Sequence, residues 1–262
     1  MGWVVYPLDH PSLRAMAASG RAALSGVLYV AAKAPRAGFA KTRLGKAIGD
    51  DAALRLYRAF ISDLAARFAT APFPVGWYVT PADAWPEVAA LLPVSDGGAR
   101  VLVQPVGDWA QRQAALFQGA AQRGEDRTVL VASDSPQLTI AVVQRALALL
   151  STCDVVLGPV HDGGYYLIGM RGSHDVLSGV AMSTATAFEQ IVERSHRAGL
   201  RLGLLETTFD VDEVAVLAAL RRVAHERDDL PATRAALEML ALECDGSENE
   251  ERMVTVGRNG SS

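Results

Sequence analysis

The sequence has 262 residues, 50% of them hydrophobic, with 29 acidic and 25 Lys and Arg side chains and a formal net charge of −4. This profile is typical of a globular protein, and the length suits one α/β domain with a sizeable core. A mildly acidic chain lacks the basic face of a general nucleic-acid binder, so we expect no nucleic-acid partner.

Short apolar runs and amphipathic segments alternate along the chain. Strands are expected at 26–32, 75–80, 100–104, 127–133, 154–160, 164–170 and 201–206. Helices are expected at 50–69, 83–92, 108–123, 137–150, 184–198, 212–227 and 231–242. This alternation is typical of βαβ units, and it predicts an α/β fold whose central sheet is mostly parallel.

The helix at 50–69 shows the clearest pattern. Its apolar side chains recur at three- and four-residue steps, at Leu54, Tyr57, Ile61, Leu64 and Phe68. Such a stripe predicts one face packed against the core. Asp108 is expected to cap the helix at 108–123, and Gly124 is expected to end it.

Polar loops follow four of the expected strands. The basic segment KAPRAGFAKTRLG (33–45) follows the first strand, and SDSP (133–136), HDGG (161–164) and FDVD (209–212) follow later ones. Ligands bind at the carboxyl ends of strands in such sheets, so we expect these loops to meet at one edge.

The charges in these loops suit a phosphorylated ligand held with a divalent ion. The first loop supplies the cations Lys33, Arg36, Lys41 and Arg43. The other three supply the carboxylates Asp134, Asp162, Asp210 and Asp212. Carboxylates bind Mg²⁺ or Mn²⁺, the metal bridges phosphate oxygens, and the cations hold the remaining charge.

Each feature also has a simpler interpretation. A basic loop is often solvated surface, and Gly38 then serves only a turn. Asp134 and Asp212 are each placed to cap a following helix, and Asp162-Gly163 is a common turn dipeptide. The basic loop lacks the GxxxxGK[ST] spacing of a Walker A motif, which argues against P-loop hydrolysis. The coincidence at four strand ends favours a binding site.

Four motifs together carry a family resemblance: KAPRAGFAKTRLG, SDSPQL, LGPVHDGGYYLIGM and FDVDEVAVL. In this order they resemble the radical-SAM/selenodomain-associated transferase family, a GT-A-like branch of the nucleotide-diphospho-sugar transferases. The resemblance runs from about Val27 to Leu240. More distantly, the basic loop is similar to that of the phospholactate and molybdenum-cofactor guanylyltransferases. The resemblance implies a single-domain, three-layer α/β/α, Rossmann-like fold.

The resemblance also implies roles for matching residues. The basic loop would bind the nucleotide's phosphates, through Lys33, Arg36, Gly38, Lys41 and Arg43. Asp134 would be catalytic and bind the metal, with Asp210 as a second ligand. Catalytic Asp162, with Gly163 and Gly164, would border the donor or acceptor pocket. This chain departs from the family in DVDEVAVL, which lacks a Thr-Pro pair after the aspartates. After the third strand the family tends to carry Gly-Asp-Leu-Gly-x-Arg, and here only the neighbours differ, since Arg112 stands at the position of the arginine.

Three functions stay open. The first is a glycosyltransferase that moves a sugar from a nucleotide-diphospho-sugar to a small-molecule acceptor, as the family's description favours. The second is a nucleotidyltransferase that joins an NTP to a phosphorylated small molecule and releases pyrophosphate, as a four-cation loop favours. The third is an inactive nucleotide-binding protein. The oligomeric state is equally open.

We expect a cytoplasmic protein with no membrane partner. The N-terminus lacks a signal-peptide pattern, and no apolar run approaches the roughly 20 residues of a membrane span. Cys153 and Cys244 are too few for a disulfide scaffold and agree with a reducing compartment. The expected organisation is an N-terminal extension with a short helix at 1–25, the transferase domain at 26–242 and a disordered tail at 243–262.

Overall fold

The computed structural model describes residues 4–5, 26–93, 100–182 and 184–243. The short helix expected within 1–25 and the tail expected after residue 243 lie outside this described part. Val4–Val5, within the expected extension, form strand β1, which pairs with β8 in the sheet.

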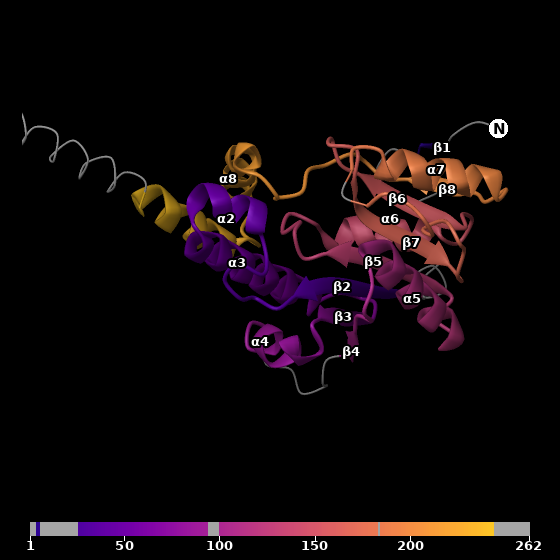
Figure 1. Cartoon of the computed structure of the whole chain (residues 1–262), viewed down its shortest axis with the longest axis horizontal. Coiled ribbons are helices and arrows are strands. Elements are labelled where there is room, and N and C mark those ends of the chain that lie inside the picture. Colours follow the sequence, from indigo (N-terminus) through magenta and orange to yellow (C-terminus); the bar gives the residue numbers. More distant parts are fainter. Residues whose placement is uncertain (1–3, 6–25, 94–99, 183, 244–262) are drawn as a thin grey trace, which may run out of the picture.

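One sheet forms the centre of the molecule (Figure 1). Its strands are β1 Val4–Val5, β2 Val27–Lys33, β3 Val75–Thr80, β4 Arg100–Val103, β5 Arg127–Ala132, β6 Val155–Pro159, β7 Tyr165–Arg171 and β8 Leu202–Leu204. Their order is β1-β8-β6-β7-β5-β2-β3-β4. Among the described strands only β7 runs antiparallel to its neighbours, β5 and β6. The predicted α/β fold with a mostly parallel sheet is confirmed.

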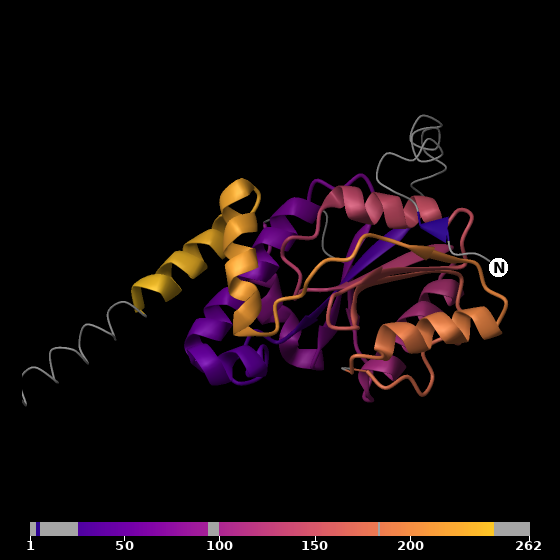
Figure 2. The ribbon, with the colours of Figure 1, turned by 90° about the horizontal axis from the view of Figure 1, so that it is seen from above.

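Helices cover both faces of this sheet, as Figure 2 shows. Helices α3 and α6 pack on one face, and α5 and α7 pack on the other. The helical elements are α2 Thr42–Ile48, α3 Asp50–Phe68, η1 Ala82–Ala84, α4 Trp85–Ala89, α5 Trp109–Gln122, α6 Ile140–Leu149, α7 Ala187–Arg197, η2 Val214–Val216, α8 Leu217–Glu226 and residues 231–243. This is the expected three-layer α/β/α arrangement.

Strand β2 shows why the sheet needs both layers. Successive side chains of a strand point to opposite faces, so Leu28 and Val30 enter one core while Val27 and Tyr29 enter the other. All four are buried. A strand covered on both faces is apolar throughout, which is why β2 was recognisable as a continuous run.

Helix α3 is buried on more sides than its stripe predicted. Leu54 is only half-buried, whereas Phe60, outside the predicted stripe, is fully buried. The C-terminal segments cover this second side. The Asp63 carboxylate accepts hydrogen bonds from the backbone N–H groups of Ala232 and Thr233, at 3.0 and 2.7 Å, and so caps the last described helix.

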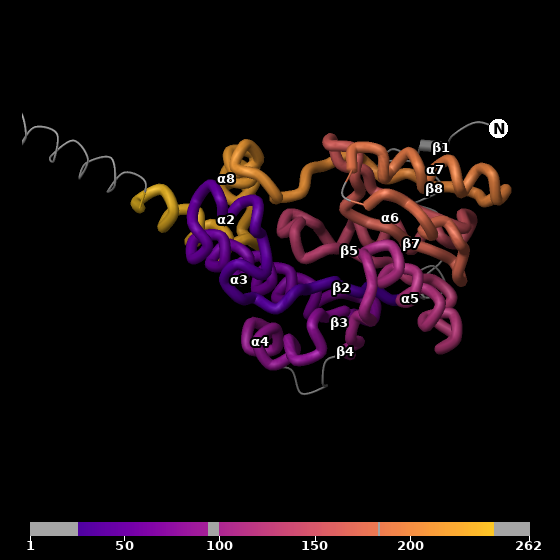
Figure 3. Tube along the Cα trace, viewed as in Figure 1, coloured from indigo at the N-terminus to yellow at the C-terminus, as the bar shows by residue number. Residues whose placement is uncertain are grey.

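The basic segment after β2 is a shorter loop than expected because it continues into helix α2. Lys41 precedes α2 with a left-handed backbone, φ 57°, and Gly49 separates α2 from α3 with φ 87°. The chain trace in Figure 3 runs from β8 across the molecule to α8, near α2, and η2 contacts α2. The segment after β8 therefore lies beside α2 and the basic segment.

Helix α5 begins as predicted. Asp108 accepts the backbone N–H of Gln111, and the Gln111 side chain accepts the backbone N–H of Asp108, both at 2.9 Å. Gly124 follows its end with φ 77°. Within the described residues, no helix has both the length and the apolar character required to cross a bilayer.

Candidate functional site

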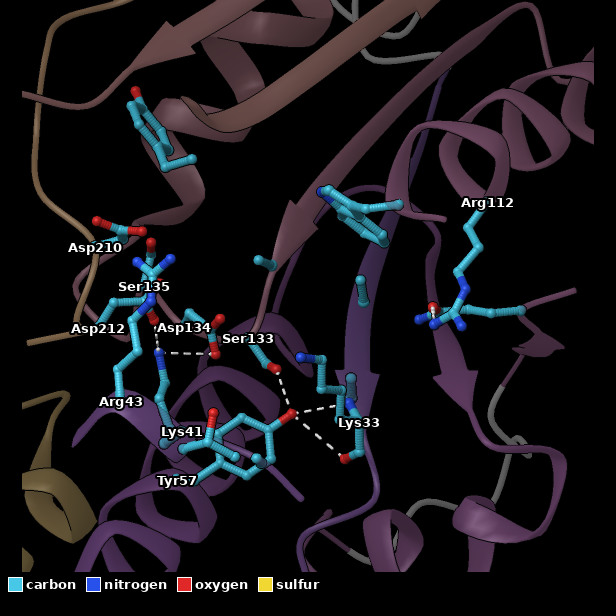
Figure 4. A pocket seen from close by; sticks show the side chains of 18 of the residues that line it. Lys33, Lys41, Arg43, Tyr57, Arg112, Ser133, Asp134, Ser135, Asp210 and Asp212 are labelled. Carbon is cyan, nitrogen blue, oxygen red and sulfur yellow. Dashed lines mark hydrogen bonds and ion pairs between the residues drawn. The ribbon is translucent and has the colours of Figure 1, made fainter. Parts of the chain in front are cut away.

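A cleft of about 460 Å³ opens at the carboxyl ends of β2 and β5 (Figure 4). This volume lies within the range of roughly 300–1,000 Å³ that is usual for ligand sites. Its charged lining residues are Lys33, Lys41, Arg43, Arg112, Asp134, Asp210 and Asp212. The structure therefore brings three of the four expected loops to one cleft, as the rule for parallel sheets predicts.

Backbone hydrogen bonds hold these loops together. The N–H of Val211 donates to the carbonyl of Asp134 at 3.2 Å, which places the segment after β8 beside the end of β5. The hydroxyl of Tyr57 accepts the backbone N–H of Lys33 at 2.9 Å and lies 2.9 Å from the Ser133 hydroxyl. Tyr57 on α3 thus joins the ends of β2 and β5 below the cleft.

The Lys41 ammonium lies between two carboxylates, not in open solution. Its Nζ is 3.0 Å from Asp134 Oδ1, 2.8 Å from Asp212 Oδ1 and 2.6 Å from the carbonyl of Val211. Its side chain is 1% exposed. An ammonium has three N–H donors, so these three acceptors use all of them. Lys41 has no donor left for a phosphate in this arrangement.

The pKa shifts follow from the same arrangement. Burial alone would lower the pKa of Lys41, but the charges of Asp134 and Asp212 outweigh burial and raise it. Burial alone would raise the pKa of Asp212, but Lys41 outweighs burial and lowers it. For Asp210, burial, with Asp212 and Asp162 nearby, raises the pKa to about 6. Asp210 is thus a carboxylate whose charge the protein does not compensate.

The cations predicted to bind phosphate divide into two groups. Lys33 and Arg43 line the cleft, and within the described part of the chain neither side chain makes an ion pair or a hydrogen bond. Arg36 lies outside the cleft lining and instead bonds to Glu87 at 2.8 Å and Asp83 at 3.0 Å. Two of the four loop cations therefore remain available to a ligand.

Helix capping does not account for Asp134 or Asp212. Helix α6 starts at Ile140, later than predicted, because the Thr139 hydroxyl accepts the Val142 N–H at 3.3 Å and caps it. Glu213 occupies the cap position before η2. The simpler interpretation of both aspartates therefore fails.

Asp162 and Gly164 line an adjoining pocket of about 290 Å³ rather than the main cleft, and Gly163 lines neither. Asp162 Oδ1 accepts the N–H of Gly164 at 3.0 Å, so Asp162 does form the expected turn. Gly163 has φ 88°, and a Cβ there would lie 1.9 Å from the carbonyl oxygen of Ala185. Gly163 thus allows a close approach of two backbones, and Gly164 lines the pocket. Gly38, with φ 67°, lies outside both pockets.

Sequence reasoning missed several residues of the cleft. Gln104, 7% exposed, donates to the carbonyl of Tyr78 at 2.7 Å and lies 3.4 Å from Arg112 Nη1. The Arg112 Nε donates to Gly107 O at 2.9 Å, which orients the guanidinium across the cleft from the aspartates (Figure 4). Trp109 lines both pockets. Only Arg112 had a sequence signal, its match to the family pattern, because a lone glutamine or tryptophan carries no motif.

Two carboxylates of the cleft are the predicted metal ligands. Asp134 and Asp210, the predicted ligands, both line the cleft. No group of three or more His, Cys, Asp or Glu in the described residues is placed to hold a metal by itself. Mg²⁺ in phosphate-transferring sites is commonly bound by one or two carboxylates together with substrate oxygens, and this donor set fits that pattern.

Comparisons with known proteins bear on the family and the fold. The family model described as "Uncharacterized protein conserved in bacteria (DUF2064)" matches residues 64–184. A solved structure of a proposed nucleotide-diphospho-sugar transferase from Desulfovibrio desulfuricans is similar at 33% identity and a TM-score of 0.74, over 81% of this chain and 94% of that one. No curated protein matches the chain.

A nucleotidyl transferase from Methanothermobacter is similar at 15% identity and a TM-score of 0.51, over 77% of this chain and 99% of that one. At this identity the likeness bears on the fold alone. These findings support the transferase part of the resemblance. The radical-SAM association stays a prediction.

Proposed function

The chain belongs to the DUF2064 family, and on that premise we propose that it is a metal-dependent glycosyltransferase that uses a nucleotide-diphospho-sugar donor. One observation carries the proposal: unpaired cations and an uncompensated carboxylate face one cleft at the carboxyl ends of the strands. The name given to the Desulfovibrio relative supports the same donor class.

Lys33 and Arg43 would bind the donor's phosphates, with Arg112 on the opposite wall of the cleft. They are the candidates because no carboxylate of the described chain pairs with them. Lys41 was expected to bind phosphate. In this proposal it is instead a positioning residue that would hold Asp134 and Asp212 in place. Arg36 would stabilise the loop through Asp83 and Glu87.

Asp134 and Asp210 would hold Mg²⁺ or Mn²⁺ together with phosphate oxygens of the donor. The bound ion would stabilise the negative charge of the departing diphosphate. Asp210 suits this part because burial, together with repulsion from Asp212 and Asp162, raises its pKa to about 6, and a bound cation would offset both effects.

The transfer step forms one bond and breaks another. The acceptor hydroxyl oxygen bonds to the anomeric carbon, and the bond from that carbon to the diphosphate oxygen breaks. The electron pair leaves with the nucleoside diphosphate, and the hydroxyl proton passes to the carboxylate of Asp162. Arg43, which lines both pockets, would lie between donor phosphates and acceptor.

The alternative, nucleotidyl transfer from an NTP, loses its main support. A loop with four available cations favoured a triphosphate, but Arg36 and Lys41 are neutralised by carboxylates of the protein. The two loop cations that remain, Lys33 and Arg43, match the charge of a diphosphate better than that of a triphosphate.

A thermal-shift panel tests the proposal. NDP-sugars and NTPs would be compared with and without Mg²⁺ or Mn²⁺, on the native protein and on Asp210→Asn. At about 100 times Kd a bound donor stabilises by about 2.7 kcal/mol, a Tm rise of roughly 5–10 °C for a domain of this size. We expect this for one NDP-sugar, only with metal and only in the native protein. A shift confined to an NTP would support nucleotidyl transfer, and metal-independent binding without turnover would support the inactive binding protein.

A further inference from the structure

The adjoining pocket differs from the main cleft in its charge. Both share Arg43, Trp109, Tyr165, Asp210 and Asp212, so the two spaces are continuous. Beyond these, the cleft is lined by three cations and one carboxylate, that of Asp134, whereas the adjoining pocket adds only the carboxylate of Asp162. Three carboxylates and one guanidinium give its described lining a formal charge of −2.

Three large and mainly apolar side chains form part of the wall of this otherwise polar pocket. Trp109, Tyr165 and Met182 line it. The Tyr165 hydroxyl donates to Gln113 Oε1 at 3.0 Å and lies 3.4 Å from Met182 Sδ, so its polar atom is already bonded. What these residues offer to a ligand is apolar surface. A sugar-like ring presents C–H faces to such surface and hydroxyls at its edge.

We propose that this pocket binds the acceptor, and that the acceptor is an uncharged or amine-bearing polyhydroxyl molecule, not a phosphorylated one. The proposal rests on the proposed function, because the donor would occupy the main cleft and engage Arg43. Hydroxyl and ammonium groups donate hydrogen bonds, which the carboxylates of Asp162 and Asp210 accept. A phosphate would meet those carboxylates with one shared cation, and like charges in a half-buried pocket repel strongly.

Met182 provides a probe of this pocket alone, because it lines the adjoining pocket and not the main cleft. Its methyl group would be followed by NMR in methionine-methyl-labelled protein, with the resonance assigned through Met182→Leu. Glucose, glucosamine and glucose 6-phosphate would be titrated as matched probes, with and without the NDP-sugar and metal.

We expect glucose or glucosamine to shift the Met182 resonance at concentrations about tenfold lower than glucose 6-phosphate. Thr184→Arg adds a cation to the rim at an exposed position and should reverse this order. Ser178→Arg, exposed and outside both pockets, is the matched control and should not.

Two results would overturn the proposal: glucose 6-phosphate binding as well as or better than glucose in the native protein, or no response to any probe. Failure of the proposed function would look different. In that case no NDP-sugar would raise the Tm, while the response of Met182 to the probes would still be measurable without nucleotide.

Discussion

Replacing Lys41 by methionine removes one charge and keeps an unbranched side chain that is one atom shorter. The ammonium now lies 3.0 Å from Asp134 and 2.8 Å from Asp212. If Lys41 positions the carboxylates, Lys41→Met should lower the free energy of unfolding and raise the affinity for a divalent ion. If Lys41 instead binds phosphate, neither property should change, and nucleotide affinity alone should fall.

The magnitude follows from the geometry. At an effective dielectric constant of about 20, two unit charges 3 Å apart attract by about 5 kcal/mol. Burying the ammonium offsets several kcal/mol of this attraction. The Asp134 and Asp212 side chains are 36% and 40% exposed, so water screens the carboxylates that remain. A net loss of about 2 kcal/mol is expected, or about 4–8 °C in Tm.

The effect also has a pH window. The pKa of Asp212 is lowered in the folded protein, so its contribution to stability is present above its unfolded pKa and is lost as pH falls through the folded value. The pKa of Lys41 is raised, so its contribution is present below its unfolded pKa and is lost as pH rises through the folded value. The difference between native protein and Lys41→Met should therefore be largest near neutral pH and vanish in acid.

Chemical denaturation from pH 7 down to about pH 2 measures the stability, because the folded pKa of Asp212 lies below its ordinary value. Calorimetric titration with Mn²⁺ measures the metal affinity. Arg43→Met is the matched control, since Arg43 is an exposed cation of the same loop without an ion pair in the described chain. It should leave stability within about 0.5 kcal/mol and weaken donor binding. Equal stability of Lys41→Met and the native protein at pH 7 would refute the positioning role.

Four further substitutions probe the rest of the site. The folded-state pKa of Asp210 is raised to about 6, so this group destabilises the fold as it ionises. The free energy of unfolding of the native protein should therefore fall by at most about 3 kcal/mol as the pH rises from 4 to 7. Asp210→Asn should abolish that loss in denaturation curves. Gly163→Ala should destabilise by about 2 kcal/mol or more, because its Cβ meets the carbonyl of Ala185, whereas Gly164→Ala, with nearest contacts of 3.2 Å, should cost less. Arg36→Gln should leave donor affinity, measured by calorimetry, within about twofold, since the guanidinium already binds two carboxylates of the protein.

The fold was largely predictable because its signals are local. Strands such as β2 and β5 are short apolar runs buried on both faces, and their carboxyl ends must share one edge when the strands are parallel. The convergence of Lys33, Arg43, Asp134 and Asp210 followed from that rule.

The partners of individual side chains were not predictable. Arg36 and Lys41 look equivalent in KAPRAGFAKTRLG, yet one turns to η1 and α4 and the other into the protein. The choice depends on the left-handed backbone at Lys41 and on the return of the segment after β8, both tertiary features. Leu54 and Phe60 on α3 were misjudged for the same reason, since the C-terminal helices cover that side.

The bond between Lys41 and Asp212 joins residues 171 positions apart in the chain. During synthesis, β2 and the basic segment leave the ribosome long before their carboxylate partner is made. A nascent chain that ends before Asp212 contains Lys41 without one of its two carboxylate partners. It also lacks the helix at 231–243, whose first turn Asp63 caps. Such long-range closure slows folding. The cleft is therefore completed only after Asp212 has emerged, and shorter chains are made without its full set of charged residues.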